Sequence, residues 1–566
     1  MQLLNRATAH KQLFGMEIAT YFLMRIRSVY HACGGLKKAS LGVFFTLAVF
    51  LSACYRPIHQ YNPWQVSETN TQAEGEFHTL VATPTLSSDV SLPARTSIAI
   101  TPTAWVAPKI TSTLAAMAPT PTPRAAIELP PLRTTETIYT VQSGDSLANI
   151  ALRHQVSVNQ LLEANDVKDP NLISVGQVLK IPPSSANEMA GNLILVPDSE
   201  LVYGPDVKDF DIESFIAQFN GVLKGYKQVD DENYELTGPE VVRRVAEENS
   251  FNPRLLLALL EFKSGWLTQE SPSGFDEIDP LGLRAIDRKG LYKQLSWIAN
   301  EVMRGSAFWK ARALSVWTLA DGSVMRIDPQ LNAGTAGLQY ALSLLFDKEQ
   351  FKQAIGKEGL LKVYQTLFGD PFAFTNDHLV PADLKQPEWM LPFETGDEWF
   401  YTGGPHWGWG SGSLWAAIDF APPSPDDEYG CFESRAPVLA VADGRVVRSG
   451  FGSVVLDFDG DGLESTGWSL LYMHIATQDR AALGVEVKQG DLIGYASCEG
   501  GISTGTHIHL ARKYNGVWIP AYGDSPFVLG GWVISSAGSV YDGYMERNGE
   551  TIEAYNGRAD FNTIRR

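Results

Sequence analysis

A long segment without apolar periodicity divides this 566-residue chain and decides how the rest can fold. Residues 54–135 are rich in Thr, Pro, Ser and Ala, as in Ala118–Pro123. Such a composition is typical of a linker that is extended where proline is dense, with a reach of at most roughly 250 Å. We therefore expect several separate domains on its C-terminal side, as the chain length also suggests.

Composition and charge restrict the possible partners. The chain is 44% hydrophobic, so sizeable cores can be buried, and its net charge is −19. A nucleic-acid-binding protein needs a basic face for the phosphates. We therefore expect no nucleic acid as a partner.

The N-terminal residues 1–53 are predicted to be an export signal. A basic segment precedes the apolar run Leu41–Leu51, which is too short to cross a bilayer as a helix. The run ends in Leu-Ser-Ala-Cys54, which resembles a bacterial lipoprotein signal. This resemblance implies a lipid on Cys54 and a location at the cell membrane, facing the cell wall. An uncleaved anchor or an ordinary secretory signal are the alternatives, and the true start could be Met16 or Met24.

The four cysteines are not spaced in the close pairs of a zinc-cysteine site. Cys33 and Cys54 lie in or beside the export signal. Cys431 and Cys498 remain as a predicted disulfide if the protein is exported. A bridge between them would close a loop of about 68 residues and stabilise the fold by roughly 4 kcal/mol.

Residues 137–182 have the pattern of a strand, two helices and a strand. We expect the second helix at Val158–Ala164 and the closing strand at Gln177–Ile181, with Ser143 or Asp145 capping the first helix. The segments YTVQSGDSLANIA and LISVGQVLKIP resemble a LysM domain. The resemblance implies a βααβ module that binds glycans containing N-acetylglucosamine, such as peptidoglycan. A structural module without a ligand is the alternative.

Residues 195–385 are predicted to be mostly helical. Thr237–Glu240 has the form of a capping box, and Asn252 with the following proline starts another helix. The motif order resembles a lytic transglycosylase, a lysozyme-like fold, but Lys263 occupies the position of the catalytic acid. Glu261 would lie about 200° round the helix and face elsewhere. We interpret the region as a degenerate lysozyme-like module for glycan binding or spacing, with an unrelated helical domain as the alternative.

Tryptophans in this region could stack on sugars, although such residues more often belong to a core. They are Trp266, Trp297, Trp309 and Trp317.

Residues 395–530 are predicted to form an antiparallel β-domain, followed by a C-terminal extension, 531–566. Short strands alternate with turn signals such as Asp443-Gly444. The expected strands are Val438–Val441, Arg445–Ser449, Val454–Phe458 and Trp468–His474. The segment Asp457–Gly462 is similar to the start of a calcium loop. The glutamate needed at position 12 is replaced by Trp468, so we interpret the segment as an acidic hairpin turn.

Histidines of this last domain suggest a metal site. His507 and His509 are two residues apart, so on a strand their side chains would share one face. Asp419 lies among Ala, Ile and Phe, where a charged group is costly unless it is paired or bound to a metal. With His406 and His474, these residues could supply three zinc ligands and groups for catalysis.

The order of these motifs is similar to that of the lysostaphin-type zinc endopeptidases. Asp419 follows His406 by thirteen positions, a spacing that resembles the staphylolysin (β-lytic) branch. The commoner branch has a histidine four residues before the aspartate, where this chain has Trp415. The resemblance implies that His406, Asp419 and His509 bind one Zn²⁺.

The same resemblance assigns catalysis to His474 and His507, which would flank the reacting water. They could act as general base and acid, or as hydrogen-bond donors to the developing oxyanion. Which residue does which stays open from the sequence.

These inferences combine into a multidomain protein: a small βααβ LysM module, a mainly α lysozyme-like middle domain and a mainly antiparallel β peptidase domain. We expect a lipid-anchored zinc endopeptidase that cuts peptide cross-links of peptidoglycan, with LysM concentrating it on the glycan strands. An inactive wall-binding protein or an activator of other hydrolases is the alternative. Glycan cleavage by the middle domain is disfavoured by Lys263.

Overall fold

The computed structural model describes most of the chain from residue 127 onward. The described residues are 127–566 without 144, 170–171, 231–232, 273–277, 284, 377 and 425–429. The predicted export signal, Cys54 and most of the linker lie outside this part. Within it, no helix is long and apolar enough to cross a membrane.

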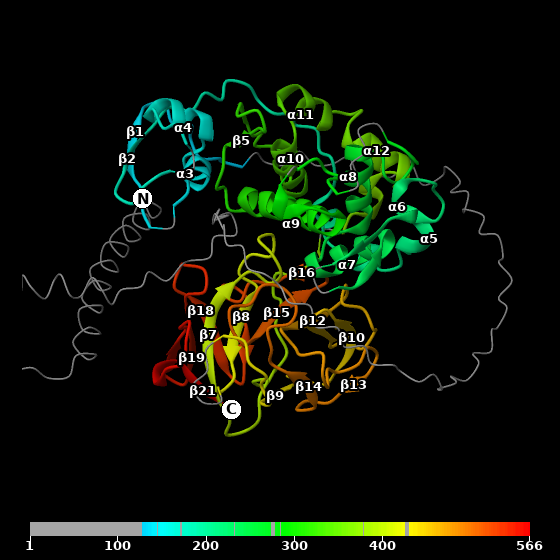
Figure 1. The fold of residues 1–566 in the computed structure, drawn as a ribbon, viewed down its shortest axis with the longest axis vertical. Helices are drawn as coiled ribbons and strands as arrows, with labels where there is room; N and C mark the ends of the chain where they lie inside the picture. The colour runs from blue at the N-terminus through cyan, green and yellow to red at the C-terminus, as the bar shows by residue number, and fades with distance from the viewer. Residues whose placement is uncertain are drawn as a thin grey trace, which may run out of the picture. The chain divides into compact units, whose positions relative to one another are not determined.

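The first described domain has the predicted strand–helix–helix–strand order (Figure 1). Its two strands pair antiparallel, and the helices cover them around a core that includes Ile150 and Leu161, both fully buried. The elements are β1 (Thr137–Thr140), α3 (Leu147–His154), α4 (Val158–Asn165) and β2 (Val178–Ile181).

The cap of α3 differs from the prediction. Ser146 is the N-cap, and its side chain accepts a hydrogen bond from Asn149 N. Asp145 is used differently, because its carboxylate accepts from Tyr139 Oη at 2.6 Å and from Gln142 N at 2.8 Å. The predicted caps Ser143 and Asp145 were therefore wrong, since the sequence did not show that β1 would capture the aspartate.

The middle region is mainly helical, as predicted, with two short antiparallel strand pairs. Its helices are α5 (Ile212–Ile216), α6 (Val222–Gly225), α7 (Gly238–Asn249), α8 (Pro253–Ser264), α9 (Leu291–Lys310), α10 (Ala333–Leu345), α11 (Lys348–Ala354) and α12 (Leu360–Phe368). The strand pairs are β3 (Lys227–Val229) with β4 (Glu235–Thr237), and β5 (Val316–Thr318) with β6 (Val324–Arg326).

Local signals of the sequence set the helix starts. Thr237 and Glu240 form the predicted capping box of α7, and Asn252 caps α8 by accepting from Arg254 N. Glu261 accepts hydrogen bonds from Leu267 N and Thr268 N and so closes the turn after α8.

Lys263, at the position of the expected catalytic acid, and three of the tryptophans pack against other side chains of the middle region. Lys263 Nζ lies 4.6 Å from the centroid of the Phe346 ring. Trp266, Trp309 and Trp317 are at most 5% exposed and belong to the core of the region. The lysozyme-like interpretation itself stays a prediction.

The last domain is built on one antiparallel sheet with the strand order β13-β10-β11-β12-β15-β8-β7-β21, to which β16 adds beside β15 (Figure 1). Its strands are β7 (Glu398–His406), β8 (Ala417–Ala421), β10 (Gly444–Gly450), β11 (Ser453–Asp457), β12 (Trp468–Met473), β13 (Glu486–Val487), β15 (Ile508–Tyr514), β16 (Val517–Trp518) and β21 (Thr563–Arg565). A separate pair joins β9 (Pro437–Leu439) to β14 (Leu492–Tyr495). All four predicted strands are present, with ends shifted by one or two residues.

The C-terminal extension is joined to this domain. It contributes β18 (Trp532–Ser536), β19 (Gly543–Arg547) and β20 (Glu550–Glu553), which form a second sheet with β17 (Val528–Leu529). The last strand, β21, pairs with β7 at the edge of the main sheet. The extension therefore covers the edge strand that ends in His406.

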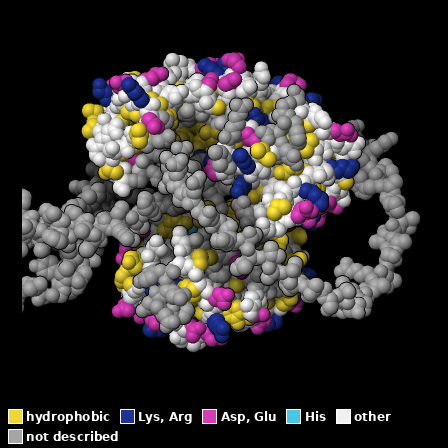
Figure 2. Space-filling view, viewed as in Figure 1, with side chains coloured by type: hydrophobic (Ala, Val, Ile, Leu, Met, Phe, Trp, Pro, Cys, Tyr) yellow, Lys and Arg dark blue, Asp and Glu magenta, His cyan; other side chains and the backbone are white. Residues whose placement is uncertain are grey.

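Charges of both signs are mixed on the surface. On the face drawn in Figure 2, basic side chains are interspersed with acidic ones.

A buried charge cluster stabilises the sheet. Glu464 accepts from Arg448 Nε at 3.0 Å and from Lys513 Nζ at 2.7 Å, and Lys513 is 1% exposed. Burial alone would raise the pKa of Glu464, but the two cations lower it to about 2. The Glu464 carboxylate therefore contributes stability above its unfolded-state pKa, and this contribution is lost as the pH falls towards 2. Burial lowers the pKa of Lys513, so the cost of burying this cation offsets part of the gain.

We expect Glu464→Gln to lower the free energy of unfolding at pH 7 by about 3 kcal/mol, because two buried cations lose their partner. The difference from wild type should shrink as the pH falls below about 4.5. Denaturant unfolding at several pH values measures both effects. Glu235→Gln, in an exposed pair with Lys227, is the control and should leave the free energy of unfolding close to that of wild type. An equal loss in both variants would contradict the assignment.

Candidate metal centre and active site

The sheet register brings three of the predicted residues together. Asp419 on β8 lies directly opposite His509 on β15, and the neighbouring strand β7 ends in His406. All three side chains are buried. Because adjacent strands position them, the separation of about ninety residues between Asp419 and His509 is bridged by backbone pairing alone.

Three ligand atoms converge at this point. His406 Nε2 and His509 Nδ1 are 3.0 Å apart, and each lies 3.2 Å from Asp419 Oδ1. Tetrahedral zinc with bonds of about 2.0–2.1 Å separates its ligands by about 3.3 Å. The spacing of the three atoms therefore fits one such ion.

The remote ring nitrogens define the tautomers. His406 Nδ1 donates to Gly404 O at 2.8 Å, and His509 Nε2 donates to Gly408 O at 2.9 Å. The other nitrogen of each neutral ring is then a lone pair, as in metal-binding histidines. Two lone pairs and the buried Asp419 Oδ1, which accepts no hydrogen bond, face one another. A cation at their centre would satisfy all three atoms.

Electrostatics favours an ionised carboxylate at this position. Burial alone would raise the pKa of Asp419, but the neighbouring imidazoles of His406 and His507 lower it well below its usual range. The group is therefore available as an anionic ligand at neutral pH.

The loop between β7 and β8 positions one of these carbonyls. Gly408 N donates to Ser413 O, and the Ser413 hydroxyl accepts from Trp409 N at 2.7 Å. These bonds close the loop, so that Gly408 O is presented to His509. This loop thus orients a candidate ligand without contributing an atom to the cluster itself.

The two other predicted histidines lie beside this cluster. His474 follows β12 in a left-handed conformation, and its ring centroid is 4.4 Å from that of His507. His507 Nε2 is 3.9 Å from Asp419 Oδ1. Both rings donate Nδ1–H to backbone carbonyls, His474 to Glu499 O and His507 to Gly505 O. Their Nε2 atoms are therefore left as acceptors beside the metal position.

Burial and the two neighbouring imidazoles of His507 and His509 lower the pKa of His474 well below its usual value. The ring is therefore neutral at pH 7 and able to accept a proton. His474 is 3% exposed, so bulk water has little access to it.

Tyr541 is part of the site although the sequence analysis did not find it. Its ring stacks on His406 with centroids 4.3 Å apart. It lies between β18 and β19 and is fixed to β7 by two backbone bonds, Gly404 N to Tyr541 O and Tyr541 N to Pro405 O. Tyr541 as a whole is 47% exposed, but desolvation of its hydroxyl and the charge of Asp419 raise its pKa, so the hydroxyl stays protonated and is a hydrogen-bond donor at neutral pH. A single tyrosine outside the histidine motifs gave no signal in the sequence.

Two other sequence features lie apart from the cluster. Trp415 contacts Tyr522, with ring centroids 5.7 Å apart, and its carbonyl accepts from Ala521 N. Its side chain therefore packs against another aromatic ring and is not part of the three-residue cluster.

The acidic segment forms the turn between β11 and β12, as interpreted. Carboxylate oxygens of Asp457, Asp459 and Asp461 lie within 4.8 Å of one another. Asp457 accepts from Asp459 N and from Gly462 N, so the turn closes on its own backbone.

Comparisons with known families agree with the domain order. Residues 139–182 match the LysM domain, residues 194–382 the N-terminal domain of LasA, and residues 431–520 Peptidase family M23. The last match contains His474, His507 and His509. The middle region thus matches the N-terminal domain of LasA.

Among curated proteins, Protease LasA of Pseudomonas aeruginosa strain UCBPP-PA14 is 26% identical over 375 residues, which cover 62% of this chain and 80% of LasA. The N-acetylmuramoyl-L-alanine amidase XlyA of Bacillus subtilis is 52% identical over 50 residues, 9% of this chain and 17% of the amidase.

Similar solved structures include an M23 metalloprotease, Pseudoalterin, from the deep sea, with 24% identity, 31% of this chain, 98% of that chain and a TM-score of 0.25. Another is the catalytic domain of lysostaphin from Staphylococcus simulans, with 24% identity, 23% and 89% coverage and a TM-score of 0.16. The domain matches carry the assignment: this chain combines a LysM domain, a LasA-type N-terminal domain and a metallopeptidase domain of family M23.

Proposed function

We propose that this protein is a zinc-dependent endopeptidase that hydrolyses peptide cross-links of bacterial peptidoglycan. The observation that carries the proposal is the convergence of three buried ligand atoms within 3.2 Å, beside two further imidazoles. The M23 match supports peptidase chemistry, and the LysM match supports peptidoglycan as the surface on which it acts.

In this proposal His406, Asp419 and His509 hold the metal. Zinc bound there would polarise the scissile carbonyl and acidify a water molecule. The carbonyls of Gly404 and Gly408 fix the two ligand rings in the required tautomers.

His474 and His507 serve the reaction. His474 is neutral and buried, so its Nε2 can accept the proton of the attacking water and return it to the leaving amine. His507 Nε2, 3.9 Å from Asp419 Oδ1, would accept a hydrogen bond from the attacking water, and the Tyr541 hydroxyl, whose ring stacks on His406, would donate to the developing oxyanion.

The location belongs to the proposal as well. Lipid attachment at Cys54 and the long linker would hold the enzyme at the membrane while its domains reach the wall. The LysM domain would raise the effective concentration of the peptidase near its substrate.

Digestion of purified peptidoglycan by the zinc-loaded protein tests the function. Mass analysis should find new amino termini in the peptides, and a chelator should prevent their appearance. Sugar-end products alone would instead indicate glycan cleavage. Wall binding without any released product would indicate a binding protein or activator, and either result would overturn the proposal.

Soluble N-acetylglucosamine oligomers should compete with binding of the intact protein to insoluble peptidoglycan, because they would occupy the LysM domain. Cleavage of a short soluble peptide should be unchanged at the same oligomer concentration. Sedimentation and a peptide assay measure the two effects. Binding that persists at saturating oligomer would contradict a LysM-directed contact.

A further inference from the structure

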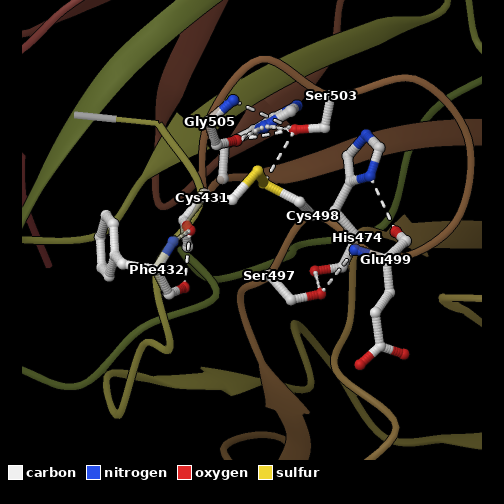
Figure 3. The surroundings of a disulfide bond; sticks show 10 residues. Cys431, Phe432, His474, Ser497, Cys498, Glu499, Ser503 and Gly505 are labelled. Carbon is white, nitrogen blue, oxygen red and sulfur yellow. Dashed lines mark hydrogen bonds between the residues drawn. A yellow bond between two sulfur atoms is a disulfide. The ribbon is translucent and has the colours of Figure 1, made fainter. Parts of the chain in front are cut away.

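The predicted Cys431–Cys498 disulfide is confirmed, with the two Cα atoms 5.9 Å apart. It joins the segment 430–432 to the loop 498–506, which precedes β15 (Figure 3). Cys431 is an exposed residue and Cys498 is half-buried, so the bridge lies near the protein surface. The bridge therefore lies close to the candidate active site and at the protein surface.

The segment 430–432 holds both ends of this loop. At the first end it holds Cys498 through the disulfide. At the other end Thr506 N donates to Gly430 O at 3.0 Å, and the Thr506 hydroxyl donates to Phe432 O and accepts from Phe432 N. The loop is thus closed on one short segment, with the disulfide as its only covalent clamp among the described residues.

The same loop supplies the hydrogen-bond acceptors of the two histidines that are not ligands. His474 Nδ1 donates to Glu499 O at 2.9 Å, as Figure 3 shows, and His507 Nδ1 donates to Gly505 O at 2.7 Å. Ser503 Oγ lies 3.3 Å from His507 Nδ1 and 3.5 Å from Cys498 Sγ. The disulfide is therefore next to the contacts that orient both rings: Glu499 follows Cys498 in the chain, and Ser503 lies between Cys498 and His507.

The Glu499 side chain also binds the segment that follows His474. Its carboxylate accepts from Thr477 N at 2.8 Å and from the Thr477 hydroxyl at 2.6 Å. Ser497, on the other side of Cys498, donates its N–H and its hydroxyl to His474 O. Movement of Cys498 would displace Ser497 and Glu499, and would thereby weaken the hydrogen bonds that both residues make to His474.

The metal ligands depend on other contacts. His406 and His509 donate to Gly404 O and Gly408 O, which lie at the end of β7 and just after it. Asp419 lies within β8. Loss of the disulfide removes none of these contacts. The positions of His474 and His507 can therefore change while the three proposed metal ligands stay in place.

We propose that the Cys431–Cys498 disulfide is a redox-sensitive positioning element for His474 and His507. Oxidised, it holds the loop and allows fast hydrolysis; reduced, it leaves the metal bound but the two imidazoles misplaced. The inference rests on the proposed hydrolytic function. It implies that the enzyme is fully active only in an oxidising environment, beyond a thiol-rich compartment.

The switching reaction is a thiol–disulfide exchange with a soluble dithiol. The thiolate of the dithiol attacks one sulfur of the bridge and forms a mixed disulfide, and the cysteine of the other sulfur leaves as a thiolate that takes up a proton. The second thiol of the reagent then releases the first cysteine. Two electrons pass to the protein, which gains two thiols, and the reagent becomes a cyclic disulfide.

The test compares full-length wild type with Cys431→Ser and with the Cys431→Ser/Cys498→Ser double variant, all zinc-loaded and without reductant. We expect kcat on a soluble peptide substrate to fall by about tenfold to a hundredfold, because misplaced catalytic groups are costly. KM and the zinc Kd, measured by competition with a chromogenic chelator, should each stay within about twofold of wild type. Hydrogen exchange should increase in residues 498–506 and remain unchanged in β8.

Wild type treated with a dithiol should lose the same activity and regain it on reoxidation. The double variant is the matched control, because it has no bridge to reduce: any further loss that it shows reports metal removal by the reagent. Should the variants fold poorly, the reversible wild-type experiment still decides.

Unchanged kcat in the reduced wild type, or an equal loss of zinc affinity and kcat, would overturn the inference. An oxidised wild type that cleaves no peptide would instead contradict the proposed function, and the exchange data would then still report whether the disulfide orders the loop.

Discussion

Replacing His509 with alanine is expected to abolish peptide hydrolysis and to weaken zinc binding by more than about 100-fold, beyond the usual effect of losing an outer hydrogen-bond partner. His509 Nδ1 supplies one of the three convergent ligand atoms, 3.0 Å from His406 Nε2 and 3.2 Å from Asp419 Oδ1. Its removal leaves two ligands and an uncompensated buried carboxylate, because Asp419 accepts no hydrogen bond at Oδ1.

Zinc stoichiometry by atomic absorption and turnover of a soluble peptide measure this expectation. His378→Ala is the control, because His378 is exposed and lies outside the cluster. That variant should retain one zinc ion and wild-type turnover. A His509→Ala protein that keeps both would exclude the three-ligand site. Added zinc at high concentration should restore little activity, since the remaining pair lacks the third ligand atom.

The residue types alone made Asp419, His507 and His509 candidates, and the resemblance to the zinc endopeptidases then implied the ligand set of His406, Asp419 and His509. An aspartate within Ala-Ile-Asp-Phe and two histidines at alternate strand positions are costly unless used together. The structure adds the register: Asp419 opposite His509, with His406 at the end of the adjacent strand. That register depends on pairing between distant strands, which local patterns do not encode.

The parts that the sequence did not predict depend on the backbone. The carbonyls of Gly404, Gly408, Glu499 and Gly505 orient the four histidine rings, yet every residue type carries such a carbonyl. Tyr541 reaches His406 only because the extension after residue 530 returns to β7. The disulfide was predictable by elimination, whereas its link to the catalytic loop required the fold.

Replacing His474 or His507 with alanine should have the opposite signature to His509→Ala: zinc stays bound while turnover falls. Neither ring is part of the three-atom cluster, and removal of a positioned acid–base group lowers kcat by about 10²- to 10⁴-fold. Metal stoichiometry and kcat, determined on the same preparations, separate the two kinds of variant. Zinc loss in either variant would place that histidine among the ligands.

The double variant His474→Ala/His507→Ala distinguishes one shared function from two independent ones. The two ring centroids lie 4.4 Å apart, so the side chains are in contact and we expect the double loss to be smaller than the product of the single losses. The pH–activity profile of the wild type supplies a second criterion, namely the pH at which activity falls on its acid limb. Because burial and neighbouring imidazoles lower the pKa of His474, this ring stays neutral as the pH falls below its ordinary value, and activity should persist below pH 6.5. Fully multiplicative losses with an acid limb at or above pH 6.5 would show that His474 is not the proton acceptor.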